Sequence, residues 1–276
     1  MADLSPGADP GARLKALRAV LLDLDGVVYT GNTPLPGGAE LVAYLRESGR
    51  RLQCITNNST QTAEQFVAKL AGMGVAVEPG QVLTSPEATA VFLQERLAPG
   101  APVMAIGEEG LVRVLLGHGF RVVDRDPEAV VCGLDRRLTY ERLTRACFAI
   151  RRGAAFVATN PDRSLPTEAG LLPGNGATLA YLQTATGVAP LVIGKPETTM
   201  LDVAMSRLGA IPGETAIVGD GLLTDIAAGR RAGLTTLLVL TGVTRAADLE
   251  GAPAPPDLVF PDLPSLLAAF GRADGR

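Results

Sequence analysis

Residues 21–31 read LLDLDGVVYTG, with two aspartates at the end of an apolar run and a glycine directly after them. The run AVLLDL over 19–24 predicts a buried strand, because its apolar residues follow one another without alternation. On a strand Asp23 and Asp25 would point to the same face, and Gly26 allows the backbone to turn there. The carboxyl end of a buried strand is where open α/β sheets bind ligands. Taken alone, the acid pair is equally consistent with a solvated loop.

Short apolar runs alternate with amphipathic stretches along the chain. This pattern predicts βαβ units and an α/β fold with a Rossmann-like parallel sheet covered by helices on both faces. The expected strands of this core are 19–24, 52–56, 191–194, 215–219, 235–240 and 258–260, and the expected helices are 38–49, 61–73, 198–208 and 223–232.

The middle of the chain has regular elements of its own. Strand-like runs at 103–107, 120–124, 129–134 and 155–160 are interleaved with helical stretches near 86–97, 108–118, 139–152 and 174–187. A section of roughly 100 residues with this much regular structure is a domain rather than a loop. We therefore predict an inserted α/β domain over 85–187, a core formed by 14–84 and 188–276, and a disordered N-terminus over 1–13.

Composition excludes several classes of function. The 276-residue chain is 47% hydrophobic and 20% charged, with a formal net charge of -4 and no basic block. This composition argues against binding of nucleic acid or an anionic membrane surface, so a small molecule is the expected partner. The only histidine, His118, lies in a turn-like LGHGF segment, which rules out HExxH zinc sites and makes a Ser-His-Asp triad improbable.

The sequence also predicts a compartment. The first residues, MADLSPGADPGARLK, carry acids and prolines where a signal peptide needs a basic end and an apolar stretch, and no apolar run approaches the roughly 18 residues of a membrane span. Cys54, Cys132 and Cys147 lack CxxC spacing and sit in apolar surroundings, as buried thiols of a reducing compartment do. We therefore expect a cytoplasmic protein.

Polar residues follow two further strands of the expected core. In ITNNST (55–60), the Thr56 hydroxyl and the amides near a helix N-terminus suit a phosphate group, although Ser59 or Thr60 could simply cap that helix. In VIGKPE (192–197), Lys195 is one of only three lysines among 25 basic residues, which suggests that a compact point charge is needed there. A solvated loop lysine is the alternative.

The stretch AIVGDGLLTDIAAG (216–229) supplies two more acids. With Asp23 and Asp25, Asp220 and Asp225 bring four carboxylates to one edge of the sheet. Such a concentration of like charge is unfavourable without a cation, and oxygen ligands suit Mg²⁺. For the last pair, an ordinary helix cap by Thr224 is the alternative.

In this order, DLDG, TNNS, GKP and GDGLLTD resemble the four motifs of the haloacid dehalogenase superfamily of phosphatases. The large insertion between the second and third motifs resembles the NagD-type, para-nitrophenylphosphatase-like and phosphoglycolate phosphatases. The likeness runs from about residue 17 to 265, and FVATNPD (156–162) with LPGNGA (172–177) resembles the cap of that subfamily. The resemblance implies a phosphomonoester hydrolase with an inserted α/β cap, acting on a small phosphorylated metabolite.

The resemblance also implies roles for individual residues. Asp23 would be the nucleophile that forms an aspartyl-phosphate, and Asp25 the general acid and later the base, with Lys195 neutralising charge on the phosphate. The phosphate would be bound by Thr56, Asn57, Asn58 and Lys195, and Mg²⁺ by Asp23, the main-chain carbonyl of Asp25, Asp220 and, through water, Asp225.

The expected cap leaves several questions open. Asn160, Asp162 and Asn175 are candidates for substrate specificity, with ordinary turn chemistry as the alternative. Gly221 departs from the subfamily, which often has asparagine or arginine there. Cap domains of this kind often pair two copies into a homodimer, but the sequence leaves the oligomeric state open. The substrate stays open among phosphoglycolate, pyridoxal phosphate, nucleoside monophosphates and sugar phosphates.

Two other functions share parts of this pattern. A phosphotransferase or mutase of the same superfamily would pass the aspartyl-phosphate to an alcohol, but its cap arrangement differs from a large insertion after the second motif. A receiver-like module would hold an aspartyl-phosphate as a signal without hydrolysing esters. The second aspartate and the insertion argue against a receiver, which is a single small domain.

Overall fold

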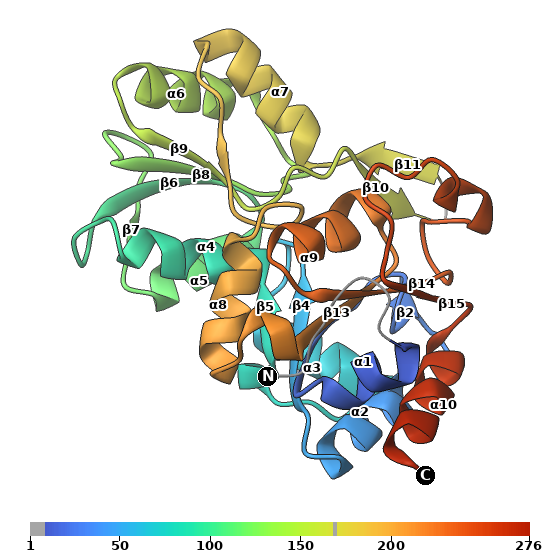
Figure 1. Cartoon of the computed structure of the whole chain (residues 1–276). Coiled ribbons are helices and arrows are strands. Elements are labelled where there is room, and N and C mark those ends of the chain that lie inside the picture. Colours follow the sequence, from blue (N-terminus) through green and yellow to red (C-terminus); the bar gives the residue numbers. More distant parts are fainter. Residues whose placement is uncertain (1–8, 168–169) are drawn as a thin grey trace. The chain divides into compact units, whose positions relative to one another are not determined.

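The computed structural model describes residues 9–167 and 170–276 (Figure 1). The chain divides into two compact units. The first comprises Met1–Thr56, Val67–Val82 and Leu201–Arg276, and the second comprises Asn57–Phe66 and Leu83–Met200. The expected inserted domain, 85–187, lies inside the second unit, which also takes in 57–66 and 188–200.

The first unit is built on a six-stranded sheet in the order β15-β14-β13-β1-β4-β5. The pairs β1–β4, β1–β13, β13–β14 and β14–β15 are all parallel. Its strands are β1 (Ala19–Asp23), β4 (Arg51–Thr56), β5 (Val82–Thr84), β13 (Thr215–Gly219), β14 (Thr235–Val239) and β15 (Leu258–Phe260). Every residue of β1 and β13 is buried, as their unbroken apolar runs predict for strands covered on both faces.

Helices flank this sheet, which confirms the predicted α/β class. Those wholly or mainly in the first unit are α1 (Pro10–Ala16), α2 (Gly38–Glu47), α3 (Ala63–Gly72), α8 (Thr199–Leu208), α9 (Ala227–Arg231) and α10 (Leu263–Asp274). A single π-helical turn, Leu222–Ile226, precedes α9. Smaller elements are the hairpin of β2 (Tyr29–Thr30) with β3 (Thr33–Pro34) and 3-10 turns at Pro79–Gln81, Pro212–Glu214 and Ala246–Leu249.

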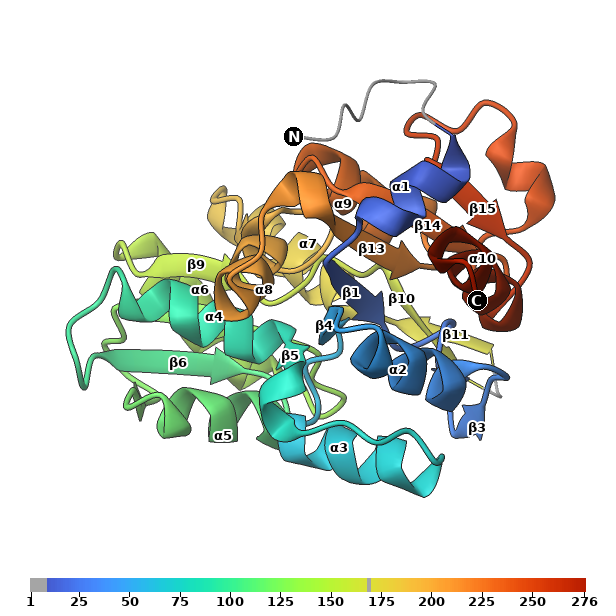
Figure 2. The ribbon, with the colours of Figure 1, turned by 60° about the horizontal axis from the view of Figure 1, so that its bottom comes forward.

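The prediction of disorder over 1–13 is wrong for residues 10–13, and residues 1–8 lie outside the described part. Helix α1 starts at Pro10 because the Asp9 carboxylate accepts a hydrogen bond from the Ala12 amide at 3.0 Å, and proline is favoured in a first turn. Leu14 is buried, and Figure 2 shows α1 beside α10. The mainly polar composition of the first residues predicted disorder, although one buried residue, Leu14, packs this helix onto the fold.

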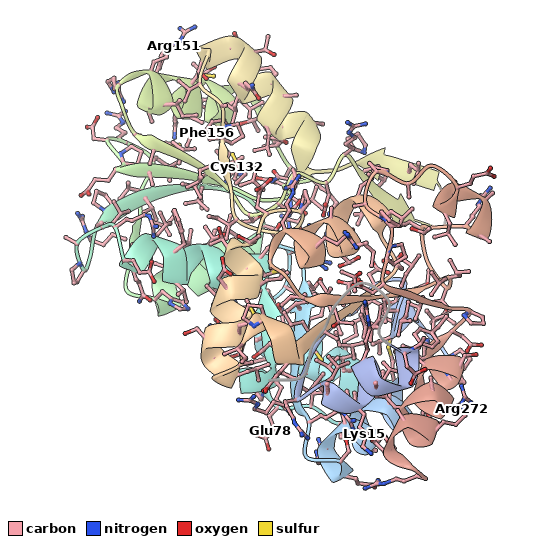
Figure 3. The ribbon with its side chains drawn as sticks, viewed as in Figure 1. Lys15, Glu78, Cys132, Arg151, Phe156 and Arg272 are labelled. Carbon is pink, nitrogen blue, oxygen red and sulfur yellow. The ribbon has the colours of Figure 1, made fainter. Side chains whose placement is uncertain are left out.

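The second unit holds a five-stranded parallel sheet in the order β12-β9-β8-β6-β7. Its strands are β6 (Pro102–Ile106), β7 (Arg121–Val122), β8 (Ala129–Cys132), β9 (Ala155–Ala158) and β12 (Leu191–Val192), and its helices are α4 (Ser85–Gln94), α5 (Glu109–Gly117), α6 (Tyr140–Arg151) and α7 (Asn175–Thr186). Figure 3 labels Cys132 and Phe156 in the core of this unit and Arg151 at its surface.

One expected core strand belongs to the other sheet. The run 191–194 contributes only β12, in which Leu191 and Val192 pair with Val157 and Ala158 of β9 in the second unit. An apolar run predicts a strand, but it carries no information about which of two parallel sheets the strand joins. The hairpin of β10 (Ser164–Thr167) and β11 (Gly170–Pro173) was not expected, because its residues do not show a clear alternation.

Two further expectations concern cysteines and membranes. All three cysteines are buried and unpaired with one another, as their apolar surroundings predict, and burial raises the pKa of the Cys54 thiol to about 12. Across the described ranges, no helix combines the length and apolarity that a membrane crossing requires.

Candidate active site

The register of the first sheet aligns the motif residues at one edge. Leu22 of β1 pairs with both Cys54 of β4 and Val218 of β13. Because all three strands run in the same direction, Asp23 and Thr56, the last residues of β1 and β4, and Asp220, which follows β13, lie at the carboxyl end of the sheet. Motifs that are far apart in the sequence thus place Asp23 and Asp220 close together in the fold.

Asp23, Asp220 and Asp225 form a group that we call the acid cluster. One carboxylate oxygen from each lies within 4.8 Å of the others. Asp23 and Asp220 are each 6% exposed, and Asp225 is 1% exposed. Three buried carboxylates at this separation repel one another strongly in the absence of a cation, and an all-oxygen donor set is the one that Mg²⁺ prefers. The donor chemistry of the acid cluster therefore fits a divalent cation.

Two glycines leave room for the Asp220 carboxylate. Asp220 Oδ2 accepts a hydrogen bond from the Val243 amide at 2.6 Å. A Cβ atom would stand 1.8 Å from Asp220 Oδ2 at Gly242 and 2.3 Å from it at Gly26, where φ is also +80°. Gly26 therefore serves the turn and the packing together. Gly242 was missed in the sequence, where only its place after β14 could have drawn notice.

The π-helical turn positions Asp225. Its Oδ2 accepts hydrogen bonds from the Gly221 amide at 3.1 Å and from the Thr224 hydroxyl at 3.2 Å. Thr224 makes no helix-capping bond, so the alternative of a helix cap is wrong. A Cβ at Gly221 would stand 2.1 Å from Thr224 Oγ1. The threonine hydroxyl thus occupies the space that a side chain at 221 would enter, which explains the glycine at this position.

Asp25 differs from the acid cluster although it is only two residues from Asp23. Asp25 is an exposed residue, yet the protein atoms packed around its carboxyl reduce its hydration, and this desolvation raises its pKa above 3.8. The Lys69 ammonium and the amides of Gly31 and Gly26 act in the opposite direction. Asp25 therefore holds a proton to higher pH than an ordinary aspartate, as a general acid needs.

Lys69 is a residue that the sequence analysis did not single out. Its Nζ lies 3.6 Å from the centroid of the Tyr29 ring, a cation–π contact with a side chain that is 2% exposed. Burial lowers the pKa of Lys69, and the Asp25 carboxylate raises it. Lys69 lies on α3, after the TNNS motif, and its rarity in an arginine-rich chain was the only signal in the sequence.

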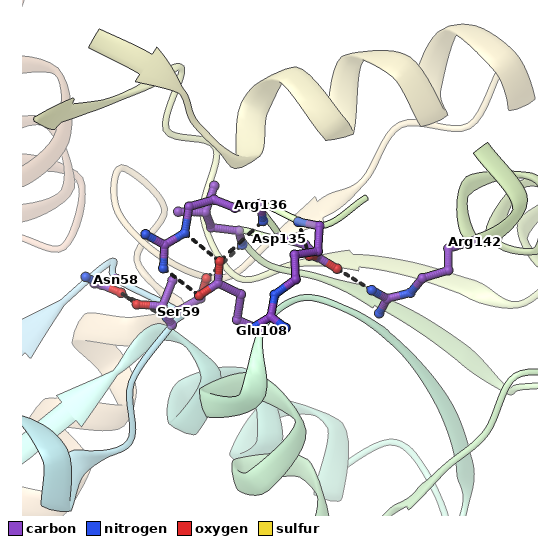
Figure 4. A network of polar contacts seen from close by, with 9 residues as sticks. Asn58, Ser59, Glu108, Asp135, Arg136 and Arg142 are labelled. Atoms are coloured by element: carbon purple, nitrogen blue, oxygen red, sulfur yellow. Dashed lines mark hydrogen bonds and ion pairs between the residues drawn. The ribbon is translucent and has the colours of Figure 1, made fainter. Parts of the chain in front are cut away.

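The loop after β4 is held inside the second unit (Figure 4). Asn58 Oδ1 accepts hydrogen bonds from the amide of Thr60 at 2.9 Å and from its hydroxyl at 2.8 Å, while Ser59 Oγ accepts one from the Leu134 amide at 2.9 Å. Neither Ser59 nor Thr60 caps α3. That role falls to Thr62, which exchanges side chain to main chain bonds with Gln65 in a capping box.

Figure 4 also shows the charged groups around this loop. Arg136 pairs with Glu108 at 2.7 Å, and its hydrogen bonds lower the pKa of Glu108. Asp135, 6% exposed, pairs with Arg142, which also donates to the Ala105 carbonyl at 3.0 Å. These ion pairs restrict the segment Asp135–Arg136, which directly follows Leu134, and so they help to hold the Leu134 amide that donates to Ser59.

Lys195 and Asn57 lie in the second unit and contact each other. The Lys195 amide donates to Asn57 Oδ1 at 3.0 Å, and Asn57 Nδ2 donates to the Lys195 carbonyl at 2.9 Å. Lys195 is 2% exposed, so the alternative of a solvated loop lysine is wrong. Asp23 belongs to the first unit, and its meeting with Lys195, Asn57 and Asn58 stays a prediction.

The three candidates for substrate specificity all contact main chain or Asn57. Asn160 Nδ2 donates to the Asn57 carbonyl at 2.8 Å, and Asp162 Oδ1 accepts from Asn57 Nδ2 at 3.1 Å. Asn175 Nδ2 donates to the carbonyls of Asn160 at 2.7 Å and Cys132 at 3.2 Å. Asn160 and Asn175 are 3% and 1% exposed. These contacts connect loops of the second unit, and recognition of a substrate by these residues stays a prediction.

Comparisons with known proteins agree with this geometry. Residues 20–121 match the family of haloacid dehalogenase-like hydrolases, and residues 192–266 match a HAD-hydrolase-like family. An acid sugar phosphatase of Staphylococcus aureus is 41% identical over 260 residues, covering 94% of this chain and all of the relative.

Solved structures show the same likeness. A 4-nitrophenylphosphatase from Thermotoga maritima superposes with a TM-score of 0.90 at 37% identity, covering 94% of this chain and 99% of its own. A glycerol phosphate phosphatase from Mycobacterium tuberculosis in complex with magnesium gives 0.85 at 39% identity, with 92% and 78% covered. NagD from E. coli K-12 gives 0.84 at 35% identity, with 90% and 97% covered. The chain belongs to the haloacid dehalogenase-like hydrolases, and within them it is a phosphatase of the NagD and nitrophenylphosphatase type.

Proposed function

We propose that this phosphatase is a Mg²⁺-dependent phosphomonoester hydrolase that acts on a small phosphorylated metabolite through an aspartyl-phosphate on Asp23. The observation that carries the proposal is the contrast between neighbouring acids. Asp23 lies in the acid cluster, whereas Asp25 lies outside it and has a raised pKa. A nucleophile that must be ionised and an acid that must be protonated need different environments of this kind.

In the first half of the reaction, an oxygen of the Asp23 carboxylate attacks phosphorus. The bond between phosphorus and the ester oxygen breaks, and the proton held by Asp25 passes to that leaving oxygen, so a neutral alcohol departs. In the second half, Asp25 takes a proton from the water that attacks the aspartyl-phosphate. Inorganic phosphate leaves, and Asp23 and Asp25 return to their starting states.

Mg²⁺ would be held by the carboxylates of Asp23 and Asp220 and the main-chain carbonyl of Asp25, with Asp225 acting through a water molecule. When bound, the ion supplies positive charge that offsets the repulsion between the Asp23 carboxylate and a phosphate dianion, an effect worth several kcal/mol in such sites. The residues of the chain do the rest. The amide of Val243 fixes Asp220, and the Gly221 amide with the Thr224 hydroxyl fixes Asp225.

Lys195 and the TNNS loop are the proposed partners of the phosphoryl oxygens. The Thr56 hydroxyl and the amides of Asn57 and Asn58 bind these oxygens, and Lys195 supplies a compact positive charge. Two observations support these roles. Thr56 is 3% exposed at the end of β4, and Lys195 is 2% exposed in the GKP motif, so its charge is held away from bulk water.

The relatives support a polyhydroxyl substrate. One is named an acid sugar phosphatase and another a glycerol phosphate phosphatase, and over the aligned residues they are 41% and 39% identical to this chain. We propose that a phosphorylated sugar or polyol is the physiological substrate class and that 4-nitrophenyl phosphate is a working substitute. A panel of phosphorylated sugars, polyols, phosphoglycolate, pyridoxal phosphate and nucleoside monophosphates, ranked by kcat/KM, tests this assignment.

The decisive experiment measures release of nitrophenol from 4-nitrophenyl phosphate with Mg²⁺ and with EDTA. We expect many turnovers with Mg²⁺ and none above background with EDTA. The variant Asp23→Asn should show no turnover. Asp202→Asn removes an exposed acid of α8 and serves as the matched control with parental activity. Full activity of Asp23→Asn would disprove the nucleophile. A single turnover would indicate a receiver-like module, and phosphate transfer to an added alcohol in preference to water would indicate a phosphotransferase.

A further inference from the structure

The Asn57 carboxamide pairs with both main-chain groups of one residue. Its Oδ1 accepts from the Lys195 amide at 3.0 Å, and its Nδ2 donates to the Lys195 carbonyl at 2.9 Å. This is the exchange of two hydrogen bonds that paired strands make, with a side-chain amide in place of the second strand. Two bonds from one planar group restrict both the position and the rotation of the Lys195 backbone.

The packing around this pair requires the glycine of the GKP motif. A Cβ at Gly194 would stand 2.6 Å from Asn57 Oδ1 and 2.5 Å from the Thr159 carbonyl oxygen. The Gly194 amide also donates to that carbonyl at 2.9 Å. The motif is therefore shaped to receive the Asn57 side chain, which accounts for a glycine whose φ is not left-handed.

Asp162 determines which way the Asn57 carboxamide faces. The Asp162 Oδ1 atom accepts from Asn57 Nδ2 at 3.1 Å, and a carboxylate can only accept while ionised. The nitrogen of Asn57 must therefore lie on the Asp162 side, and the oxygen is left for the Lys195 amide. The orientation of the carboxamide follows from this network of donors and acceptors.

The backbone of Asn57 is fixed by two other side chains. Its carbonyl accepts from Ser85 Oγ at 2.6 Å and from Asn160 Nδ2 at 2.8 Å. The carbonyl of Asn160 in turn accepts from Asn175 Nδ2 at 2.7 Å. The loops after β9 and β12 and the start of α4 thus contact Asn57, and the start of α7 contacts Asn160 in turn. We call Asn57 with Asp162 and Lys195 the amide junction.

We propose that Asn57 is a positioning residue for Lys195 and that Asp162 is the residue that orients Asn57. In this assignment the Asn57 side chain sets the backbone from which the Lys195 ammonium reaches the phosphoryl group, and Asp162 acts through Asn57. The inference rests on the proposed function, because positioning matters for turnover only if Lys195 acts on the phosphate. The pairing itself can be tested without turnover.

The substitution Asn57→Asp removes the Nδ2 donor and keeps the size and shape of the side chain. The new carboxylate still accepts from the Lys195 amide, but it cannot donate to the Lys195 carbonyl and it faces the Asp162 carboxylate. We expect kcat/KM to fall by about 10²-fold, the scale of a catalytic group displaced by about 1 Å. The loss should appear mainly in kcat. Gln183→Glu adds the same charge on an exposed face of α7 and should retain parental kinetics.

The double variant Asn57→Asp with Asp162→Asn exchanges the two groups. The amide placed at 162 donates to the carboxylate placed at 57, so one carboxylate is again opposite one amide. We expect kcat/KM at least about tenfold above that of Asn57→Asp alone, because the repulsion is removed and the acceptor for the Lys195 amide is held. A double variant no better than the single variant would overturn the role of Asp162.

Hydrogen exchange separates this inference from the proposed function. Asn57→Ala should accelerate exchange of the Lys195 amide, measured on a peptide that contains it by mass spectrometry, at an unchanged global melting temperature. If Lys195→Ala keeps full activity, the proposed role of Lys195 fails, whereas faster exchange in Asn57→Ala still supports the pairing. Unchanged exchange in Asn57→Ala, with Lys195→Ala inactive, would overturn the inference and leave the proposed function standing.

Discussion

The acid cluster and the amide junction stabilise their residues by opposite means. In the acid cluster, three buried carboxylates lie within 4.8 Å of one another, and the Gly221 and Val243 amides with the Thr224 hydroxyl donate hydrogen bonds to Asp225 and Asp220. In the amide junction, donors face acceptors: the Asn57 carboxamide is matched by Lys195 and Asp162. Substitutions that change charge should therefore have the largest effect in the acid cluster. Substitutions that exchange a donor for an acceptor should have the largest effect in the amide junction.

The largest difference is expected from Asp225→Asn. Removing one of three like charges should reduce kcat/KM with Mg²⁺ by about 10²-fold or more, because the cation loses part of its charge complement. The same variant without Mg²⁺ should melt at a higher temperature than the parent, since repulsion in the cluster is relieved. Activity and calorimetry with and without Mg²⁺ check both results. A lower melting temperature without Mg²⁺ would show that hydrogen bonds, rather than charge, dominate here.

Gly242→Ala tests how tightly the Asp220 carboxylate is enclosed. The added Cβ would stand 1.8 Å from Asp220 Oδ2, so backbone must move. We expect the free energy of unfolding to fall by about 1–3 kcal/mol and the Mg²⁺ requirement for half-maximal activity to rise. Gly72→Ala, at the end of α3 with open space around it, is the matched control and should be neutral or stabilising. Parental Mg²⁺ dependence in Gly242→Ala would refute the enclosure.

Lys69→Met tests the environment of Asp25, which belongs to neither arrangement. The Lys69 ammonium lowers the pKa of Asp25, whose burial raises it. Removing the ammonium should raise the pKa further, so the protonated acid persists to higher pH. The alkaline limb of kcat for an alkyl phosphate should move upward in pH, with a smaller change for 4-nitrophenyl phosphate, whose leaving group barely needs a proton. Lys69→Arg keeps the charge and should keep the parental profile.

The smallest effect is expected at Asp274 on α10, which belongs to neither arrangement. Hydrogen bonds from Arg50 at 2.7 and 2.8 Å lower the pKa of Asp274 from 3.8 to about 2. A carboxyl whose pKa is lowered in the folded state stabilises the fold at pH values above 3.8, its pKa in the unfolded chain. This contribution is lost as the pH falls toward 2. Asp274→Asn should therefore destabilise the chain by about 1 kcal/mol near neutral pH and negligibly below pH 2. Urea titrations across this range check it, and an equal loss at both ends would contradict the ion pair.

The sequence predicted the elements that depend on long apolar runs. Strands β1, β4, β13 and β14 lie where short, mainly apolar runs predict them, and the alternation of strands with helices predicts the parallel sheets. The prediction failed for β12, because local pattern does not specify a partner strand. It also failed for residues 10–13, where a single buried leucine and an aspartate cap outweigh a polar composition.

The residues of the acid cluster could be predicted for a similar reason. Asp23 ends one fully buried parallel strand and Asp220 follows another, and such strands end at one edge of the sheet. Thr62 as the cap of α3 was missed, since several hydroxyl residues in a row satisfy the same capping pattern, and Thr224 was considered only as a helix cap. Only coordinates distinguish which hydroxyl makes the bond.

By itself, the sequence determined the fold class and the order of the four motifs, because strand burial and strand direction are local properties that apolar runs carry. The tertiary structure decided what each polar group contacts. In the folded chain Asn57 bonds to the Lys195 backbone and to Asp162, Lys69 packs on the Tyr29 ring, and Thr224 donates to Asp225. Hydrogen bonds and charge contacts act over a few ångströms between residues that can be more than a hundred positions apart, and no local pattern records such distances.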